Sequence, residues 1–408
     1  MKISIIIPTR ERAYYLKSSI QTVLDIKDDN IELIVADNAS TDGTRQVVAG
    51  FDDPRLIYLP SERRVSMREN FNRSVLGSSG DYVLIFGDDD AIVPGQFKYL
   101  RQIAEDRRPD AVTWGKAGYY WPVENYGKNP GTIRFYRSRS FGPIFHYDPS
   151  TQIEPLLECN FSVMNPPPHI YHGCVSRAYL DRISPKPDLY FDGVIPDVNF
   201  QFRAIFEGGD FWHVHHPFTI NGASPASNGS ATVDVKAASG SPKIAQAFNE
   251  ENKVDPYDDV IDHAQTIDLV IFSTLETLRE RGGYGHHRPN FRNWYKYGLN
   301  AVNRRPDLED RIMQALNQHA EKTNTQSELA QAASAVLPKR TFSQRLQKAL
   351  GQVGTFKLDT ELDGENTVLN AARIMDAVLG DGFDAVVSGT STKSAAWRKA
   401  KQAAKSFL

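Results

Sequence analysis

Three consecutive carboxylates, Asp88, Asp89 and Asp90, follow an apolar run at residues 82–86, with Gly87 between them. Such a run, bounded by turn residues, predicts a buried strand. Like charges held this close repel, so the chain must either solvate them or neutralise them with a cation. A row of oxygen ligands suits Mg²⁺ or Mn²⁺. We therefore predict a divalent-metal site at the end of this strand, with a solvated acidic turn as the alternative.

The elements that must position these carboxylates alternate between strand and helix over about the first 115 residues. β-Branched runs indicate the strands, and apolar residues at helical spacing indicate the helices. Strands are expected at residues 3–7, 31–36, 56–59, 82–86 and 111–114, and helices near residues 16–24, 67–76 and 97–104. This alternation predicts right-handed crossovers and a doubly wound α/β sheet.

Polar side chains end two more of the expected strands. Thr9 and Arg10 follow the first strand, and Asp37 and Asn38 follow the second. Because the carboxyl ends of parallel strands meet at one edge of a sheet, these residues should lie beside the three aspartates. The first strand is followed neither by Gly-x-Gly-x-x-Gly nor by a phosphate-binding P-loop. A metal ion would then neutralise any phosphate bound at this edge.

Four segments carry a family resemblance, in the order IIIPTR at 5–10, ADNASTDGT at 36–44, MRENFN at 67–72 and GDYVLIFGDDD at 80–90. Together they resemble the family 2 glycosyltransferases, which have a GT-A fold with a doubly wound mixed sheet. The resemblance implies metal-dependent, inverting transfer of a sugar from a nucleotide-diphosphate donor, with a UDP-sugar as the first guess. The implied acceptor is a glycan or lipid-linked glycan, and the implied setting is cell-surface polysaccharide or glycolipid synthesis.

The same resemblance implies site residues. Asp37 matches the carboxylate that hydrogen-bonds the nucleobase, although a helix-capping turn is the alternative for an aspartate in such a loop. Asp89 and Asp90 match the metal-binding end of an Asp-x-Asp motif, and Gly87 stands where many members place its first aspartate. The expected nucleotide-binding residues are Thr9, Arg10, Asp37, Asn38, Arg68, Asn70 and Asp88.

Asp197 is the general base that the resemblance implies. It follows Pro196 at the opening of an expected helix, where the helix dipole stabilises a carboxylate. Family members carry an acidic pair there, and this chain keeps one acid of the two. A helix-start aspartate without a catalytic part is the alternative, and Asp192 is the second candidate base. Residues 221–224 lack the family's Arg-x-His, so the third metal ligand is unassigned.

The composition excludes several classes of partner. With 40% hydrophobic and 24% charged residues, the 408-residue chain is typical of a soluble protein. Its formal net charge of −3 gives no overall attraction to nucleic acid, so no nucleic-acid partner is expected. We find no signal peptide and no apolar run near the ~20 residues of a membrane span. Two cysteines outside any redox spacing favour a cytoplasmic protein, peripheral at most to the inner face of the membrane.

The expected organisation is a catalytic domain, a connecting loop and a helical C-terminal region. The boundaries are 1–220 for the GT-A domain (1–115 for the nucleotide-binding half and 116–220 for the acceptor half), 221–241 for a flexible linker or lid, and 242–408 for the helical region. The aromatic and basic stretch 115–149 favours a β-hairpin over a sugar-binding surface. The basic helix at 394–408 predicts contact with a membrane or a partner, with a solvated helix as the alternative.

Two other functions are compatible with these features. A nucleotidyltransferase would use a similar sheet and similar carboxylates, but the Gly-rich loop that it needs after the first strand is missing. A catalytically inactive scaffold of the same fold would bind a nucleotide sugar or a glycan without turnover. Release of pyrophosphate would indicate the first of these functions, and binding without any release would indicate the second.

Overall fold

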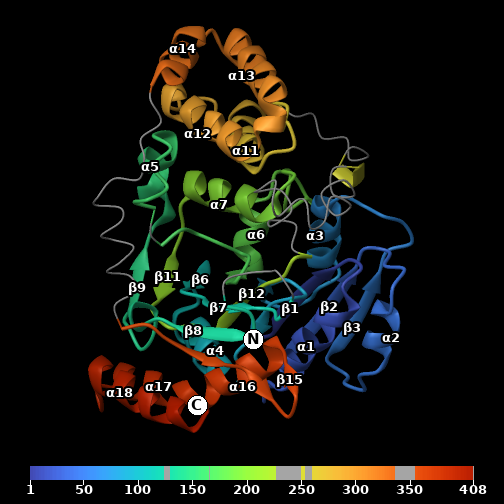
Figure 1. Ribbon diagram of the computed structural model, residues 1–408, viewed down its shortest axis with the longest axis vertical. Coiled ribbons are helices and arrows are strands. Elements are labelled where there is room, and N and C mark those ends of the chain that lie inside the picture. Colours follow the sequence, from blue (N-terminus) through green and yellow to red (C-terminus); the bar gives the residue numbers. More distant parts are fainter. Residues whose placement is uncertain (124–128, 165, 227–249, 253–259, 336–353, 408) are drawn as a thin grey trace.

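The computed structural model describes residues 1–123, 129–164, 166–226, 250–252, 260–335 and 354–407. A mixed sheet of eight strands lies at its centre (Figure 1). Across this sheet the order is β3 (Leu56–Pro60), β2 (Ile31–Asp37), β1 (Ile3–Thr9), β4 (Tyr82–Ile85), β10 (Gly173–Ser176), β6 (Ala111–Trp114), β11 (Phe211–Val214) and β9 (Ile144–Tyr147). The predicted α/β fold with a doubly wound mixed sheet is confirmed.

The direction of each strand decides which residues meet at its ends. β1, β2, β3 and β4 run parallel, and β11 is parallel to β6. β10 lies antiparallel between β4 and β6, so β6 runs in the same direction as β4. The carboxyl ends of β1, β2, β4, β6 and β11 therefore share one edge of the sheet, and β10 begins at that edge.

The sequence patterns located most of this sheet. All five strands expected in the first 115 residues are present, within two residues of the expected ends. The apolar spacing of residues 175–183 also predicts a helix, and there the structure differs. The structure has β10 first and α6 (Arg177–Ile183) after it, because Ser176 caps the helix by accepting a hydrogen bond from the Tyr179 N–H.

Helices cover both faces of the eight-stranded sheet, as doubly wound folds require. Successive residues of a strand point to opposite faces. Ile5 packs in one cluster with α1 (Ala13–Leu24), α2 (Thr44–Ala49) and α4 (Phe97–Arg107). Ile6 packs in another cluster with α3 (Met67–Leu76), α6 and α7 (Pro196–Glu207). Both faces of β1 are thus apolar, which explains its nearly continuous apolar run.

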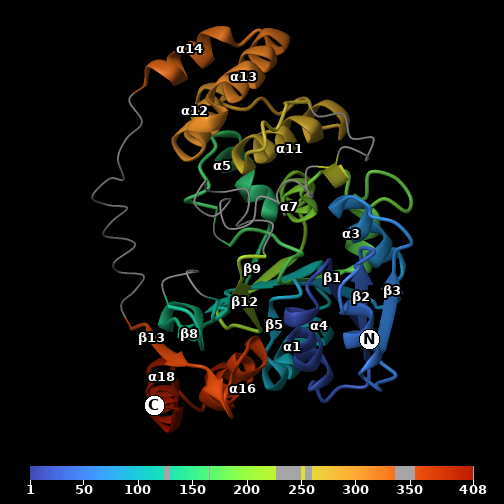
Figure 2. The same cartoon turned by 45° about the vertical axis from the view of Figure 1, so that its right-hand side comes forward.

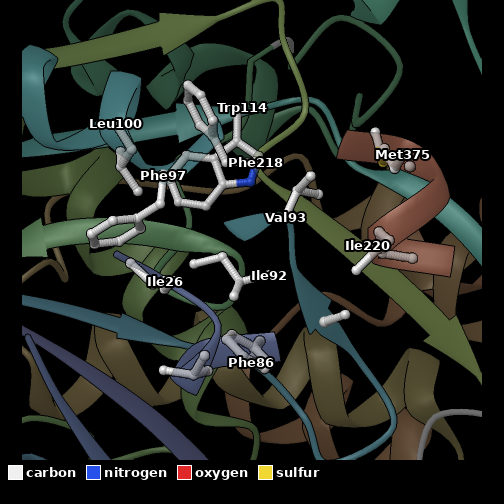
Figure 3. Packing of buried hydrophobic residues seen from close by; sticks show 14 of the residues in the cluster. Ile26, Phe86, Ile92, Val93, Phe97, Leu100, Trp114, Phe218, Ile220 and Met375 are labelled. Atoms are coloured by element: carbon white, nitrogen blue, oxygen red, sulfur yellow. The ribbon is translucent and has the colours of Figure 1, made fainter. Parts of the chain in front are cut away.

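A second sheet of five strands shares the largest hydrophobic core with the first. Its order is β13 (Phe356–Asp359), β8 (Thr132–Phe135), β7 (Ala117–Tyr120), β12 (Thr219–Ala223) and β5 (Ala91–Ile92). β7 and β8 form the antiparallel hairpin predicted within 115–149. The rings of Trp114 and Phe218 meet in the core with 5.3 Å between centroids (Figure 3). β5 directly follows Asp90, so this sheet fixes the far end of the acidic segment.

The C-terminal part of the chain lies at two opposite ends of the molecule (Figures 1 and 2). Helices α11 (Ile267–Arg281), α12 (Phe291–Arg304), α13 (Glu309–Thr323) and α14 (Gln326–Ser334) form a separate apolar cluster with α5 (Ile153–Leu157) and α7. β13 and helices α16 (Val368–Leu379), α17 (Gly382–Val387) and α18 (Lys393–Ala403) join the main core instead. The region 242–408, expected as one helical unit, is therefore divided, and its second part supplies a strand to the five-stranded sheet.

Two expected boundaries also differ from the structure. Residues 221–223, expected to open a flexible loop, complete β12, and residues 227–241 lie outside the described residues. The first domain therefore extends beyond residue 220. The apolar residues Val260, Ile261, Ala264 and Ile267 are spaced as in a helix, which predicts a helix from Val260. In the structure α11 begins at Ile267, where Thr266 accepts a hydrogen bond from the Leu269 N–H.

The basic helix near the C-terminus buries its apolar face within the protein. Trp397 is 4% exposed, and its ring centroid lies 5.1 Å from that of Phe356 in β13. The exposed side of the helix carries the basic residues Arg398, Lys399, Lys401 and Lys405. The apolar surface that a membrane-bound helix would insert is thus covered by the chain itself. Of the helices that the structure describes, none is long and apolar enough to cross a membrane.

Candidate active site

Strand direction brings most of the expected site residues to one edge of the eight-stranded sheet. Thr9 ends β1 and is paired in register with Asp37, which ends β2. The three aspartates lie just beyond β4, and Lys116 lies just beyond β6. Because β10 is antiparallel, the residues that precede it, Tyr171 and His172, reach this edge as well. The first, second, fourth and sixth strands therefore converge on the acidic segment.

Asp88 is held by the loop that follows β1. Thr9 donates a hydrogen bond of 2.6 Å from its hydroxyl to Oδ2, and Arg12 donates one of 2.9 Å to Oδ1. The guanidinium of Arg12 also donates to the carbonyl oxygen of Ala226, just after β12. Burial lowers the pKa of Arg12, but Asp88 and Asp89 raise it by more. Arg12 is therefore a firmly charged partner that neutralises Asp88.

Asp90 joins the end of β4 to β12 and to the start of β10. Its Oδ1 accepts a hydrogen bond of 2.7 Å from the Gly222 N–H. Its Oδ2 accepts from the Gly87 N–H at 2.8 Å and from the Tyr171 hydroxyl at 2.6 Å, and His172 Nε2 lies 3.1 Å away. Burial raises the pKa of Asp90, but His172 and these donors lower it below its ordinary value. Both oxygens of Asp90 are thus occupied by protein donors.

Asp89 lies between these two carboxylates and has fewer partners. Ser224 donates a hydrogen bond of 2.6 Å to its Oδ2, and Trp121 Nε1 donates one of 2.9 Å to its backbone oxygen. A Cβ on Gly222 would lie 1.7 Å from that backbone oxygen, so the close approach of β12 requires glycine. Burial and the neighbouring Asp90 raise the pKa of Asp89 far above its ordinary range. The charge of Asp89 is therefore poorly compensated by the protein.

This uneven distribution of partners decides which carboxylate fits a divalent cation. Within the described residues, no three Asp, Glu, His or Cys side chains are grouped as a metal site. Mg²⁺ commonly takes one or two carboxylates and completes its shell with phosphate oxygens and water. Asp89, buried and poorly neutralised, fits such a role, whereas the oxygens of Asp90 already accept hydrogen bonds. Metal binding at Asp89 and Asp90 stays a prediction.

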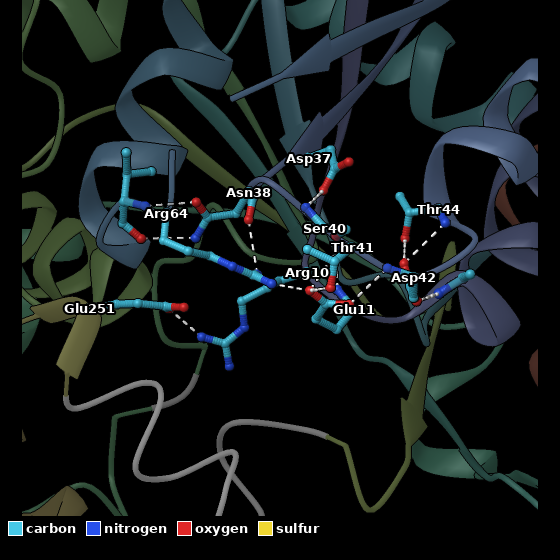
Figure 4. Close-up of polar contacts among 12 residues, drawn as sticks. Arg10, Glu11, Asp37, Asn38, Ser40, Thr41, Asp42, Thr44, Arg64 and Glu251 are labelled. Atoms are coloured by element: carbon cyan, nitrogen blue, oxygen red, sulfur yellow. Dashed lines mark hydrogen bonds and ion pairs between the residues drawn. The ribbon is translucent and has the colours of Figure 1, made fainter. Parts of the chain in front are cut away.

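Asp37 and Asn38 hold the loops around the end of β2 (Figure 4). Asp37 accepts a hydrogen bond of 3.0 Å from the Ser40 N–H and one of 2.6 Å from the Tyr58 hydroxyl. Burial and Asp37 raise the pKa of Tyr58 to about 12. The Asn38 side chain makes two hydrogen bonds, of 2.8 and 2.9 Å, with the backbone of Val65. Asp37 thus stabilises a turn but does not cap α2, which begins at Thr44 with Gly43 as its N-cap. Its contact with a nucleobase stays a prediction.

Arg10 is paired with a carboxylate from far along the chain. Its guanidinium contacts Glu251, while Arg64 contacts Glu11 beside it (Figure 4). Burial lowers the pKa of Arg10, and the neighbouring Arg12 and Arg64 lower it further. Three guanidinium groups therefore gather at the carboxyl end of β1. Such a group favours an anion, and in this structure carboxylates take that place.

Helix α3 carries the remaining two expected nucleotide-binding residues. Asn70 is buried, donates to the carbonyl oxygen of Ala36 at 3.1 Å and accepts from Arg73 at 2.7 Å. Its amide thus fixes the end of β2 to α3. Arg68 lies in the first turn of the same helix and is half-buried. A contact of either residue with a nucleotide stays a prediction.

Asp197 differs from the other carboxylates because no side chain of the described residues hydrogen-bonds to it. It is half-buried in the first turn of α7, after Pro196 at the start of that helix. Burial raises its pKa, and the Val198 N–H and the positive charge of Lys116 lower it. Lys116 also interacts with Asp90, and burial lowers its own pKa. Lys116 thus lies within electrostatic reach of both Asp197 and the acidic segment.

Asp192, the second candidate base, is already neutralised. Both of its oxygens accept hydrogen bonds of 2.7 Å from the guanidinium of Arg203. Asn199 donates a third bond of 2.9 Å to Oδ1. Donors of the protein thus already hold both oxygens, so neither is free to contact an acceptor hydroxyl. The geometry therefore favours Asp197 over Asp192 as a base.

Several residues of this site were not predicted from the sequence. Arg12 and Lys116 are basic residues just beyond expected strands, and that position could have marked them. Tyr171 and Ser224 reach the aspartates from segments about 80 and 135 residues away along the chain. Their contribution depends on tertiary packing, so no local pattern reveals it.

A known protein family matches the N-terminal part of the chain. Residues 4–155 match the family model described as Glycosyl transferase family 2. This segment contains the acidic residues beyond β4 and the loops after β1 and β2. This N-terminal part of the chain is thus similar to glycosyltransferase family 2.

The similarity to individual proteins is confined to part of their length. Abequosyltransferase RfbV of Salmonella typhimurium is 35% identical over 107 residues, which are 25% of this chain and 32% of that protein. The GalNAc(5)-diNAcBac-PP-undecaprenol beta-1,3-glucosyltransferase of Campylobacter jejuni is 31% identical over 108 residues, 26% of this chain and 35% of that protein. The chain thus spans about a third of the length of these relatives. A crystal structure of S. aureus TarS 1-349 in complex with UDP-GlcNAc is 14% identical, with a TM-score of 0.45 over 90% of this chain and 95% of that one.

Proposed function

We propose that the chain is an inverting glycosyltransferase. It moves a sugar from a nucleotide-diphosphate donor to a hydroxyl group of a glycan or lipid-linked glycan, in the synthesis of a cell-surface polysaccharide or glycolipid. The observation that carries this proposal is the division of the carboxylates at the sheet edge. Asp88 is ion-paired, Asp89 is buried with its charge poorly compensated, and Asp197 has a carboxylate without a side-chain hydrogen bond. The match of residues 4–155 to the family 2 model and the names of the similar proteins support it.

The donor would lie along the carboxyl edge of the sheet. Its nucleoside would contact the loops that end at Asp37 and Asn38, and its diphosphate would face Asp89 and the guanidinium groups of Arg10 and Arg12. When bound at Asp89, Mn²⁺ or Mg²⁺ would neutralise negative charge on the leaving diphosphate. A UDP-sugar is the first donor class to test.

Asp197 would act on the acceptor. Its carboxylate takes the proton of the acceptor hydroxyl as that oxygen attacks the anomeric carbon of the donor sugar. The new carbon–oxygen bond forms on the face opposite the diphosphate, whose bond to the sugar breaks, so the configuration inverts and a nucleoside diphosphate leaves. A base in this position contributes ~10²–10⁴-fold to the rate. Burial raises the pKa of Asp197, whereas the positive charge of Lys116 lowers it. Lys116 therefore favours the ionised form of Asp197, which is the form that can accept a proton.

The proposal is tested by a donor screen on the full chain. Thermal shift and nucleoside-diphosphate release would be measured with UDP-, GDP- and dTDP-sugars, each with and without Mn²⁺. We expect one nucleotide class to stabilise the protein in a metal-dependent manner and to be hydrolysed slowly. Release of pyrophosphate instead would indicate a nucleotidyltransferase.

Two aspartate variants sharpen this screen. Asp89→Asn should abolish the metal-dependent part of the stabilisation, because it removes the charge that would hold the cation. Asp106→Asn is the matched control, since Asp106 is exposed in the last turn of α4, just before β6 begins at the opposite edge of the sheet. Stabilisation by a nucleotide sugar with no turnover in any condition would contradict transfer and indicate an inactive scaffold.

A further inference from the structure

Tyr14 is the most exposed of the large apolar side chains that the structure describes, at 67%. It lies in the first turn of α1, two residues after Arg12, which binds Asp88. A single exposed aromatic residue is common on protein surfaces and needs no explanation by itself. What distinguishes Tyr14 is the set of rings that supports it.

Three aromatic side chains form that support. The Tyr14 ring lies 5.2 Å from Tyr15 and 5.7 Å from Trp121, measured between centroids. Tyr15 and Trp121 meet edge to face at 4.8 Å, and Tyr119 packs on Trp121 at 5.5 Å. Trp121 and Tyr119 are fully buried. Tyr14 is therefore the exposed end of a rigid aromatic cluster that joins α1 to the β7 segment.

This cluster is tied to the acidic segment by direct contacts. Trp121 Nε1 donates a hydrogen bond of 2.9 Å to the backbone oxygen of Asp89. Burial and the neighbouring Asp89 raise the pKa of Tyr15. In the sheet, β4 and β2 lie on opposite sides of β1, so the cluster is on the Asp89 side and Asp37 is on the other. If the nucleobase of a nucleotide sugar lies near Asp37, the sugar at the other end of the ligand would lie on the side of Tyr14.

An exposed aromatic ring beside Asp89 can bind the C–H face of a sugar ring. The face of an aromatic ring carries negative electrostatic potential, and the axial C–H bonds of a pyranose ring present weakly positive hydrogens. We propose that Tyr14 is a sugar-stacking residue, which binds the pyranose ring of the donor or of the acceptor beside Asp89. This inference rests on the proposed function and adds to it the residue that recognises the sugar.

The test compares Tyr14→Ala with Tyr14→Phe, which keeps the ring. Because Tyr14 is exposed, both variants should fold, and unchanged melting temperatures would establish this. In the donor arm, calorimetry would measure binding of UDP, GDP and dTDP and of the hexose derivative of whichever nucleotide the wild type binds. In the acceptor arm, saturation-transfer NMR would measure binding of methyl glucoside, methyl galactoside and methyl N-acetylglucosaminide.

We expect Tyr14→Ala to weaken sugar binding in one arm by roughly 3- to 10-fold, while the nucleoside diphosphate binds as before and Tyr14→Phe behaves as the wild type. The affected arm identifies the sugar as that of the donor or of the acceptor. Tyr120→Ala is the matched control, since Tyr120 is exposed on β7 and points to the opposite face from Tyr119.

Either of two results would overturn the assignment: equal binding by the wild type and Tyr14→Ala in both arms, or no sugar signal with the wild type in either arm. Failure of the proposed function is distinguishable, because it would appear as wild-type protein that binds none of the three nucleotides.

Discussion

Arg12 donates a hydrogen bond of 2.9 Å to Oδ1 of Asp88, and this ion pair fixes the loop after β1 to the end of β4. Asp88 is 1% exposed, and the Arg12 side chain is 15% exposed. Two of the segments that the family model covers are therefore held together by one charge pair. Thr9 donates a hydrogen bond to the other oxygen of the same carboxylate, so Asp88 holds this loop at two points.

Removal of one partner of this pair should destabilise the protein. Arg12→Met leaves Asp88 buried without its cation, and a broken buried pair of this kind costs about 3–5 kcal/mol in free energy of unfolding. Asp88→Asn should cost a similar amount. Urea unfolding of both variants and of the double variant would check this, and the double variant should lose clearly less than the sum. Additive losses would show that the two side chains do not act as a pair.

Asp89 should make stability depend on pH. Its pKa is raised in the folded state by burial and by Asp90, so the folded protein holds a proton there that the unfolded chain has lost. The free energy of unfolding should therefore fall as pH rises from the ordinary carboxyl range toward neutrality. Mn²⁺ should reverse this trend, because it favours the ionised form.

The measurement is the difference in melting temperature between the wild type and Asp89→Asn, taken from pH 4.5 to pH 8 without and with Mn²⁺. Burial lowers the pKa of His213 and His216, and this makes the free energy of unfolding rise with pH, opposite to the effect of Asp89. Both proteins contain these histidines, so the difference between them reports on Asp89 alone. A difference that stays constant across this range would show that the Asp89 pKa is ordinary.

Much of the fold could be read from local patterns. The apolar run before the aspartates has the length and the boundaries of a strand, and α3 spans residues 67–76, where the apolar spacing predicts a helix. The place of β10 could not be predicted, because it depends on pairing between Cys174 and Leu84, 90 residues apart in the chain. The residues that pack against the C-terminal helix could not be predicted for the same reason. Its spacing shows that an apolar face exists, and only the tertiary structure shows that Phe356 covers Trp397.

The candidate site, like the fold, could be predicted only in part from the sequence. Carboxylates at strand ends, such as Asp88 and Asp37, could be selected because strand direction places them at one edge. Which oxygens remain available could not be predicted. Ser224 supplies a donor to Asp89, and Tyr171 supplies one to Asp90, from segments whose own sequence gives no sign of it.

Lys116 should set the pH at which the proposed base works. Burial raises the pKa of Asp197 and Lys116 lowers it, so the acid limb of kcat/KM should lie above the ordinary aspartate value of ~3.9. Lys116→Met should move that limb to higher pH, because the compensating charge is lost, and Lys116→Arg should restore it. A pH profile with the same acid limb in all three proteins would exclude this role.

The C-terminal segment should contribute to the stability of the catalytic domain. Trp397→Ala removes a buried ring that packs on β13, and such a change costs about 3–5 kcal/mol in free energy of unfolding. Arg398→Ala, on the exposed side of the same helix, should stay within about 0.5 kcal/mol of the wild type. Chemical unfolding of the two variants gives the comparison. Equal stability of both would mean that α18 does not stabilise the core.

Turnover by an Asp197 variant tests most directly the claim that Asp197 is the general base of a glycosyl transfer. Turnover of the nucleotide-sugar donor in the presence of acceptor would be compared between the wild type, Asp197→Asn and Asp192→Asn, with donor affinity measured in parallel. We predict that Asp197→Asn lowers kcat by ~10²–10⁴-fold with donor affinity unchanged. We expect a far smaller decrease of kcat in Asp192→Asn, because the Asp192 carboxylate is already bound by Arg203. A turnover in Asp197→Asn within a few-fold of the wild type would contradict the account.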